Sequence, residues 1–154
     1  NIAMAALKFF MLKVHPKKRM VFNPKESLDM QGQTGPYIQN AFVRIKSVLR
    51  KSLNSPNDLF RFYSGIKEEE KELISLLETY PEVVKKAVEQ YDPSEIANYS
   101  YSLAKAYHKF YHEVPILRSE DQAALHFRLV LSEAVGQILK KSFYLLGIEM
   151  PERM

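Results

Sequence analysis

Apolar residues recur at intervals of three and four through most of the chain, which is the period of a helix with one buried face. The clearest case lies in residues 36–51, where the apolar positions are Ile38, Ala41, Phe42, Ile45, Val48 and Leu49. The period returns in residues 96–114, and helices are also predicted over 68–79, 81–91 and 120–146. Residues 2–14 are apolar on nearly every side, which is typical of a helix surrounded by protein. The pattern predicts an all-α helical bundle.

Capping signals set the ends of these helices. Residues 23–29 begin with Asn-Pro, a cap and a first helical position, and predict a short helix. Residues 92–95 and 119–122 have the sequence form of capping boxes. Gly147 is placed to end the last helix in a left-handed conformation.

The stretches between the helices suggest two units. Residues 20–22 predict one short strand near the front, and residues 54–57 predict a loop. The most irregular stretch, residues 31–36, contains two glycines and a proline and marks a boundary. The chain is therefore divided into residues 1–31 and residues 32–154.

Charge is distributed unevenly along the chain, although the net formal charge is only +4. Residues 1–51 carry ten basic and two acidic residues, whereas residues 52–154 carry twelve basic and sixteen acidic residues. Six of the ten bases precede Gly32, and the other four are Arg44, Lys46, Arg50 and Lys51. An excess of this kind predicts a surface that faces an anionic partner.

Composition excludes several classes of protein. The chain has no Cys, which excludes disulfide scaffolds, thiolate nucleophiles and Cys-ligated zinc. It has five Gly and lacks both glycine-rich phosphate-binding motifs, GxxxxGK and GxGxxG. The longest apolar stretch, residues 2–11, contains Lys8. It is far shorter than the roughly 20 residues that cross a bilayer, so no membrane partner is expected.

Two histidines and several carboxylates are candidates for chemistry, and each has a simpler interpretation. His108 and His112 stand four residues apart, a spacing that lets two imidazoles share a metal, but the motif lacks the glutamate of a zinc peptidase. A solvated helix face is therefore favoured. The acids at 68–70 and 120–121 lie in first helical turns, where capping and the helix dipole account for them. We predict no catalytic and no metal-binding residue.

Basic residues interleaved with aromatic residues give the strongest functional signal. They are Tyr37, Asn40, Arg44, Arg50 and Lys51 on one predicted helix, with Tyr107 and Tyr111 on a later one. Proteins bind single-stranded RNA by stacking bases on such rings and pairing phosphates with Lys or Arg. Most of the nine tyrosines are nevertheless expected in the core, because tyrosine at helical spacing is commonly buried. RNA binding is thus one hypothesis, and an ordinary aromatic core is the other.

Two segments resemble arginyl-tRNA synthetases. Residues 32–48 read GQTGPYIQNAFVRIKSV, similar to that family's junction, usually GNT(A/G)PYLQYAxxRIxSI. Residues 145–154 read LLGIEMPERM, close to the family's usual terminus. The resemblance covers essentially the whole chain, and the junction and terminus are specific together.

The resemblance implies the all-helical, DALR-type anticodon-binding domain at the C-terminal end of a class I synthetase. Residues 1–31 would be the tail of the catalytic domain, which accounts for the apolar first helix, and residues 32–154 would be the anticodon-binding domain. The full enzyme would join arginine to tRNA(Arg) using ATP and Mg²⁺. This fragment would bind the anticodon stem-loop without catalysing and without a cofactor. The implied chain is cytoplasmic, monomeric and packed against its own catalytic domain.

The resemblance also implies which residues contact RNA. Tyr37 matches an aromatic residue that faces the anticodon loop, while Asn40 stands where Tyr is common, so stacking there becomes an amide hydrogen bond or is lost. Tyr111 matches an anticodon-contacting tyrosine, and Met154 matches a terminal methionine that packs against a base. Arg44 matches a family position from which it reaches a phosphate or pairs with another helix. The predicted set is Tyr37, Asn40, Arg44, Lys51, Tyr107, Tyr111 and Met154.

Other interpretations stay open at this point. Arg128 also matches the family but is expected to be structural. The chain is alternatively a helical protein-interaction module with a basic docking face, or a metal-dependent enzyme that uses His108 and His112. A related DALR-domain synthetase, such as the cysteine enzyme, is disfavoured by the GxTGPY junction and the PERM ending.

Overall fold

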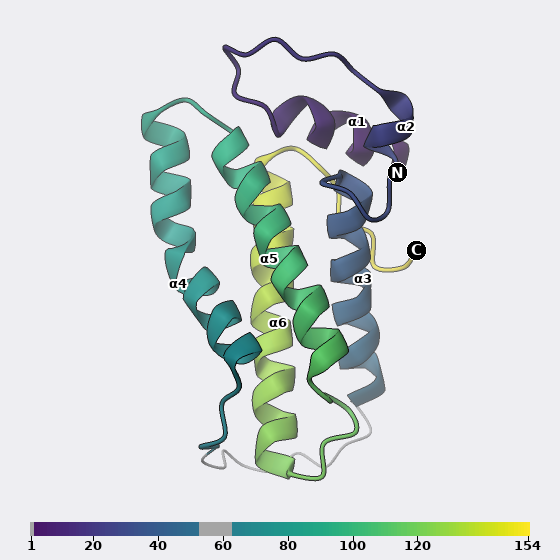
Figure 1. Cartoon of the computed structure of the whole chain (residues 1–154), viewed down its shortest axis with the longest axis vertical. Coiled ribbons are helices and arrows are strands. Elements are labelled where there is room, and N and C mark those ends of the chain that lie inside the picture. Colours follow the sequence, from purple (N-terminus) through teal and green to yellow (C-terminus); the bar gives the residue numbers. More distant parts are fainter. Residues whose placement is uncertain (1, 53–62) are drawn as a thin grey trace.

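Helices account for all the regular structure in the described residues, 2–52 and 63–154, of the computed structural model (Figure 1). Their bounds are α1 Ile2–Leu12, α2 Pro24–Ser27, α3 Gly35–Ser52, α4 Glu68–Glu89, α5 Ser94–Glu113 and α6 Gln122–Leu145. The predicted all-α bundle is therefore confirmed. The predicted loop at 54–57 lies outside the described residues.

Four long helices form the bundle, and α1 lies across one end of it (Figure 1). Helix α6 packs against α3, α4 and α5, so its apolar side chains face neighbours in several directions. Helix α1 contacts α3 and α5, and its Phe9 ring lies 6.1 Å from the ring of Phe143 between centroids. The bulkiest fully buried apolar side chains are Tyr107, Phe9, Phe42, Phe110, Phe143, Ile38, Ile45, Leu73, Leu103 and Leu139.

Only part of α1 is covered. Ala5, Ala6, Phe9 and Phe10 are buried, whereas the apolar side chains on the opposite side remain exposed. The exposed residues are Ile2, Met4, Leu7 and Met11. The all-round apolar pattern of residues 2–14 therefore leaves an apolar face that none of the described residues buries.

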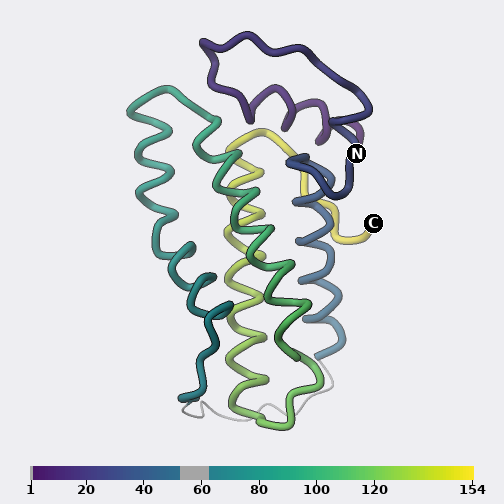
Figure 2. Tube along the Cα trace, viewed as in Figure 1, coloured from purple at the N-terminus to yellow at the C-terminus, as the bar shows by residue number. Residues whose placement is uncertain are grey.

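A tail after α6 turns back along α3 (Figure 2). Gly147 has φ 67°, and the bonds from Gly147 N to Tyr144 O (3.0 Å) and from Ile148 N to Phe143 O (2.8 Å) complete a Schellman motif. The predicted left-handed end is thus confirmed. Gln39 Nε2 then donates to Glu149 O at 2.9 Å, which ties the tail to α3.

Several predicted boundaries are wrong. Residues 20–22 form no strand, because no other strand exists in the described part of the chain for them to pair with, and Val21 is 89% exposed. The two helices predicted on either side of Pro81 are one helix, α4, with Pro81 inside it. A proline removes only one helical hydrogen bond, and Figure 1 shows that α4 changes direction along its length, as a helix that contains proline commonly does.

Capping agrees with the sequence in kind but differs in register. The Asn23 side chain accepts from Lys25 N and Glu26 N, as predicted, but α2 ends at Ser27. Asp92 Oδ1 accepts from Ser94 N at 3.0 Å, so α5 begins at Ser94. Asp121 Oδ1 accepts from Ala123 N at 2.9 Å, so α6 begins at Gln122 and the predicted Ser119 cap lies outside it.

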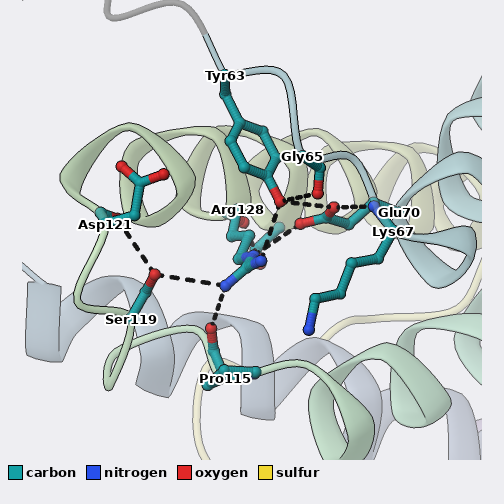
Figure 3. A network of polar contacts seen from close by, with 9 residues as sticks. Tyr63, Gly65, Lys67, Glu70, Pro115, Ser119, Asp121 and Arg128 are labelled. Atoms are coloured by element: carbon teal, nitrogen blue, oxygen red, sulfur yellow. Dashed lines mark hydrogen bonds and ion pairs between the residues drawn. The ribbon is translucent and has the colours of Figure 1, made fainter.

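A buried ion pair joins α4 to α6 (Figure 3). Arg128 Nε lies 2.7 Å from Glu70 Oε1, and the two side chains are 5% and 0% exposed. Arg128 Nη1 donates to Pro115 O at 2.7 Å and Nη2 donates to Tyr63 Oη at 3.0 Å. Glu70 Oε2 accepts from Lys67 N at 2.6 Å. The structural role expected of Arg128 is confirmed. Glu70 caps the start of α4, as interpreted from the sequence, but it is also wholly buried and paired with Arg128, which the sequence did not indicate.

These contacts govern the pKa values in the network. Burial lowers the pKa of the Arg128 guanidinium, but the hydrogen bonds and charge of Glu70 and Tyr63 outweigh it, and the net pKa is raised. Burial also raises the pKa of the Tyr63 hydroxyl. Both the Arg128 guanidinium and the Tyr63 hydroxyl therefore keep their protons at neutral pH.

Glycine allows α1 to approach α3 closely. A Cβ on Gly35, the first residue of α3, would lie 2.6 Å from Ala5 O and 2.9 Å from Ala5 C. Both atoms belong to backbone, which cannot rotate away as a side chain can. Gly35 is therefore required by the packing of α1 on the start of α3.

We predict that Glu70→Gln lowers the free energy of unfolding by about 3 kcal/mol or more, because it leaves the buried Arg128 guanidinium without a counter-charge. Urea unfolding measures the change. Glu72→Gln is the matched control, because Glu72 is on the same helix but half-exposed and 4.0 Å from Lys109. Equal stability of the two variants would contradict a structural role for the pair.

We predict that Gly35→Ala destabilises the chain by about 1–3 kcal/mol, because the added methyl overpacks against the backbone of α1. Hydrogen exchange should show faster exchange of the α1 amides in particular. Gly32→Ala serves as the control, since a Cβ there meets only the Asp29 side chain at 3.1 Å. Unchanged α1 protection in Gly35→Ala would show that the contact is not limiting.

Candidate nucleic-acid interface

Helical spacing brings four predicted RNA-contacting residues to one side of α3. Tyr37, Asn40, Arg44 and Lys51 are separated by three, four and seven residues, so their side chains share a face. The first three are half-buried and Lys51 is exposed. Ring and hydrogen-bond contacts direct this side toward α5. These four residues face a second row of side chains on α5, namely Tyr101, His108, Tyr111 and His112. We call the two rows together the α3–α5 face.

Tyr37 lies at the upper end of the α3–α5 face between two rings of α5. Its ring centroid is 5.4 Å from that of Tyr101 and 4.7 Å from that of His108. Its backbone N donates to Thr34 Oγ1 at 3.2 Å, and the Thr34 hydroxyl in turn donates to Asp29 O. Burial raises the pKa of the Tyr37 hydroxyl, with a further increase from Tyr101. Tyr37 is therefore held in place and is a neutral hydroxyl.

His108 is neutral and partly enclosed. Burial lowers its pKa, and the nearby positive charge of Arg44 lowers it further. Its Nε2 atom is buried without a hydrogen-bond partner in the described structure. The solvated helix face expected for His108 is therefore wrong, because α3 covers it.

Arg44 sits at the centre of the α3–α5 face. Its Cζ atom is 4.6 Å from the centroid of the Tyr111 ring, and its Nη1 atom is 3.1 Å from His112 Nε2. The Tyr111 and His112 rings meet edge-on at 5.7 Å. Tyr111 is 38% exposed, so part of its ring faces solvent. The sequence left two roles for Arg44, a contact with phosphate or an ion pair with another helix. Its partners on α5 are the rings of Tyr111 and His112 and not a carboxylate, so the described structure shows no such ion pair.

A groove of about 500 Å³ opens beside Tyr111, between the end of α3 and the connection from α5 to α6. Its lining residues include the buried apolar side chains Val48, Val114 and Ile116. Tyr111 and His112 supply aromatic rings, and the exposed cations Lys51 and Arg118 belong to its rim. The exposed carboxylate of Glu113 also lines the groove. Ring walls and two cations suit a planar base joined to a phosphate.

Two predicted contact residues lie elsewhere. Tyr107 is 0% exposed, its hydroxyl donates to Ser132 Oγ at 3.2 Å and burial raises its pKa, so its ring belongs to the core and not to the α3–α5 face. Met154 is 48% exposed at the end of the tail. The tail contacts Lys46 and Arg50, roughly half a turn around α3 from Tyr37. The structure therefore does not bring Met154 beside Tyr111.

Sequence reasoning missed four residues of this region: Tyr101, His108, His112 and Arg118. Tyr101 and the ring-wall role of His112 had a signal in the sequence, because positions 101, 108 and 112 share one side of a helix. Arg118 lies in the connection after α5, and no periodic pattern indicates where a loop residue points.

No group of three His, Asp or Glu residues able to hold a metal ion occurs in residues 2–52 and 63–154. The guanidinium beside His112 Nε2 also disfavours a second cation there. Among the helices described, none is both long and apolar enough to cross a membrane.

Comparison with known proteins finds relatives along nearly the whole chain. Proteins named arginine–tRNA ligase from Parabacteroides distasonis and Flavobacterium psychrophilum are 48% and 46% identical to it. The matches cover 99% and 100% of this chain but 26% and 25% of those proteins, so the chain spans about a quarter of their length.

Solved structures agree with the sequence matches. Arginyl-tRNA synthetase of Thermus thermophilus superposes with a TM-score of 0.88 at 30% identity, covering 99% of this chain and 26% of that one. The Plasmodium falciparum enzyme shares the fold, with a TM-score of 0.83 at 23% identity, over 99% of this chain and 27% of that one. The family described as DALR anticodon binding domain matches residues 38–154. The chain therefore belongs to the DALR anticodon-binding domain family.

Proposed function

We propose that this chain binds the anticodon stem-loop of tRNA(Arg) through the α3–α5 face, as the anticodon-binding part of an arginine–tRNA ligase. The observation that carries the proposal is the contact of Arg44 from α3 with the partly exposed Tyr111 ring from α5, beside a groove that Tyr111 and Lys51 line. Tyr37 lies further along the same face, against His108. Membership of the DALR family supports RNA over the protein-interaction alternative.

The chemistry of the face suits an unpaired loop. The exposed part of the Tyr111 ring offers a stacking surface, and a base stacked on an aromatic ring gains about 1–3 kcal/mol. Lys51 and Arg118 on the groove rim are placed to pair with phosphates on either side of such a base. Asn40 supplies an amide for a base edge.

We propose that the chain binds without catalysing. In a full-length ligase, ATP with Mg²⁺ and arginine would be bound by a separate catalytic domain, so this chain requires no cofactor of its own. The exposed apolar face of α1 supports docking against that domain, with residues 1–31 as its tail. The proposed setting is the cytoplasm, with the chain as a monomer.

An anticodon stem-loop assay tests the function directly. The chain should bind a stem-loop with an arginine anticodon more tightly than one in which the anticodon is replaced and the stem retained. Fluorescence anisotropy with labelled RNA measures both affinities. Failure to bind either RNA would exclude tRNA recognition and favour the protein-interaction module, which should ignore the stem-loop and keep its partner after RNase treatment.

We predict that Tyr111→Ala and Lys51→Ala weaken binding in different ways. Tyr111→Ala should lose stacking, about 1–3 kcal/mol or roughly five- to 150-fold, with little change in the salt dependence. Lys51→Ala should mainly reduce the slope of log K against log salt, by about 0.7 for one single-strand phosphate contact. Tyr144→Ala on α6 is the control, because Tyr144 is 81% exposed and away from this face. Unchanged affinity of Tyr111→Ala would contradict stacking.

A further inference from the structure

The guanidinium of Arg44 occupies part of the ring that the proposed function uses for stacking. Arg44 Cζ lies over the Tyr111 ring at 4.6 Å from its centroid, while Nη1 is 3.1 Å from His112 Nε2. Because the Tyr111 and His112 rings are nearly perpendicular, at 83°, one guanidinium contacts the face of one ring and the nitrogen of the other. The Tyr111 surface is therefore partly covered before any base arrives.

The contacts that hold Arg44 are weak ones for a cation. A ring face and an imidazole nitrogen are neutral partners, and no carboxylate is paired with Arg44 in the described ranges. The side chains around Arg44 are basic instead. Its charge lowers the pKa of His108, and Lys51 is seven residues further along the same side of α3. A guanidinium bonds more strongly to a phosphate, through paired charge-assisted hydrogen bonds. An RNA phosphate within reach would thus bind the Arg44 guanidinium in preference to the Tyr111 ring.

The side chains that Arg44 contacts also form part of the groove. Tyr111 and His112, the two rings that Arg44 contacts, also line the 500 Å³ groove. Departure of Arg44 would therefore free both its aromatic walls at once.

We propose that Arg44 is a latch, an inference that rests on the proposed function. In the free chain its guanidinium covers Tyr111 and is held by His112. When RNA binds, the guanidinium moves to a phosphate and a base takes its place on the Tyr111 ring.

Nuclear magnetic resonance observes the latch directly. In the free chain, the Arg44 Nε–Hε resonance, assigned by its absence in Arg44→Met, should be displaced upfield by the ring current of Tyr111. That displacement should vanish in Tyr111→Leu. It should also vanish when the chain is saturated with the anticodon stem-loop. An Arg44 resonance that keeps its ring-current displacement in the saturated complex would overturn the latch.

The affinity of the Arg44→Met variant for the anticodon stem-loop, measured across salt concentrations, is a second and independent test. The variant should reduce the salt slope by about 0.7, because one phosphate contact is lost. At high salt, where that contact counts for little, it should bind about two- to fivefold more tightly than the parent, because no cation competes for the ring. Weaker binding at every salt concentration would mean that the base stacks on the guanidinium itself, which overturns the latch.

A pair of variants at His112 isolates the hydrogen bond. His112→Gln keeps an acceptor for Arg44 and His112→Leu removes it, and neither titrates. The leucine variant should bind the stem-loop about twofold or more tightly than the glutamine variant. Equal affinities would overturn the latch as stated. Absence of saturable binding by the parent chain would instead reject the proposed function, so the two failures are distinguishable.

Discussion

The buried pair of Glu70 and Arg128 is the interaction on which the functional end of the bundle depends. It joins α4 to α6, and Arg128 also bonds Pro115 O, which lies in the connection that forms one wall of the groove. An uncompensated charge in this place would cost several kcal/mol, so the two side chains bind each other or the region rearranges. The position of the groove wall is thereby set by a charge pair in the core and not by the loop's own sequence.

Close packing performs the same task at the other end of the bundle. Gly35 lets the backbone of α1 contact the start of α3, and Lys8 Nζ donates to Gly147 O at 2.6 Å. These contacts tie the first helix and the last turn of α6 to the end of α3 that carries Tyr37. The ring surfaces of the α3–α5 face are therefore held by a rigid scaffold, which is what stacking on an unpaired base requires.

Sequence patterns predicted the features that depend on neighbours along the chain. The helical period located α3, α5 and α6, and the spacing of Tyr37, Asn40, Arg44 and Lys51 placed them on one side of α3. Contacts between distant segments were not predictable in this way. Tyr107 and Tyr111 are both tyrosines on α5. Tyr107 is buried against Ser132, whereas part of Tyr111 is exposed to solvent.

By itself the sequence determined the all-α class, the left-handed end at Gly147 and the resemblance to one family, because each rests on local spacing or on contiguous motifs. Tertiary structure alone decided that α4 continues through Pro81, that Glu70 is buried with Arg128 and that Arg44 lies over Tyr111. These features depend on which helices meet and at what register. Burial and pairing are properties of the assembled bundle, and no segment of the chain specifies them alone.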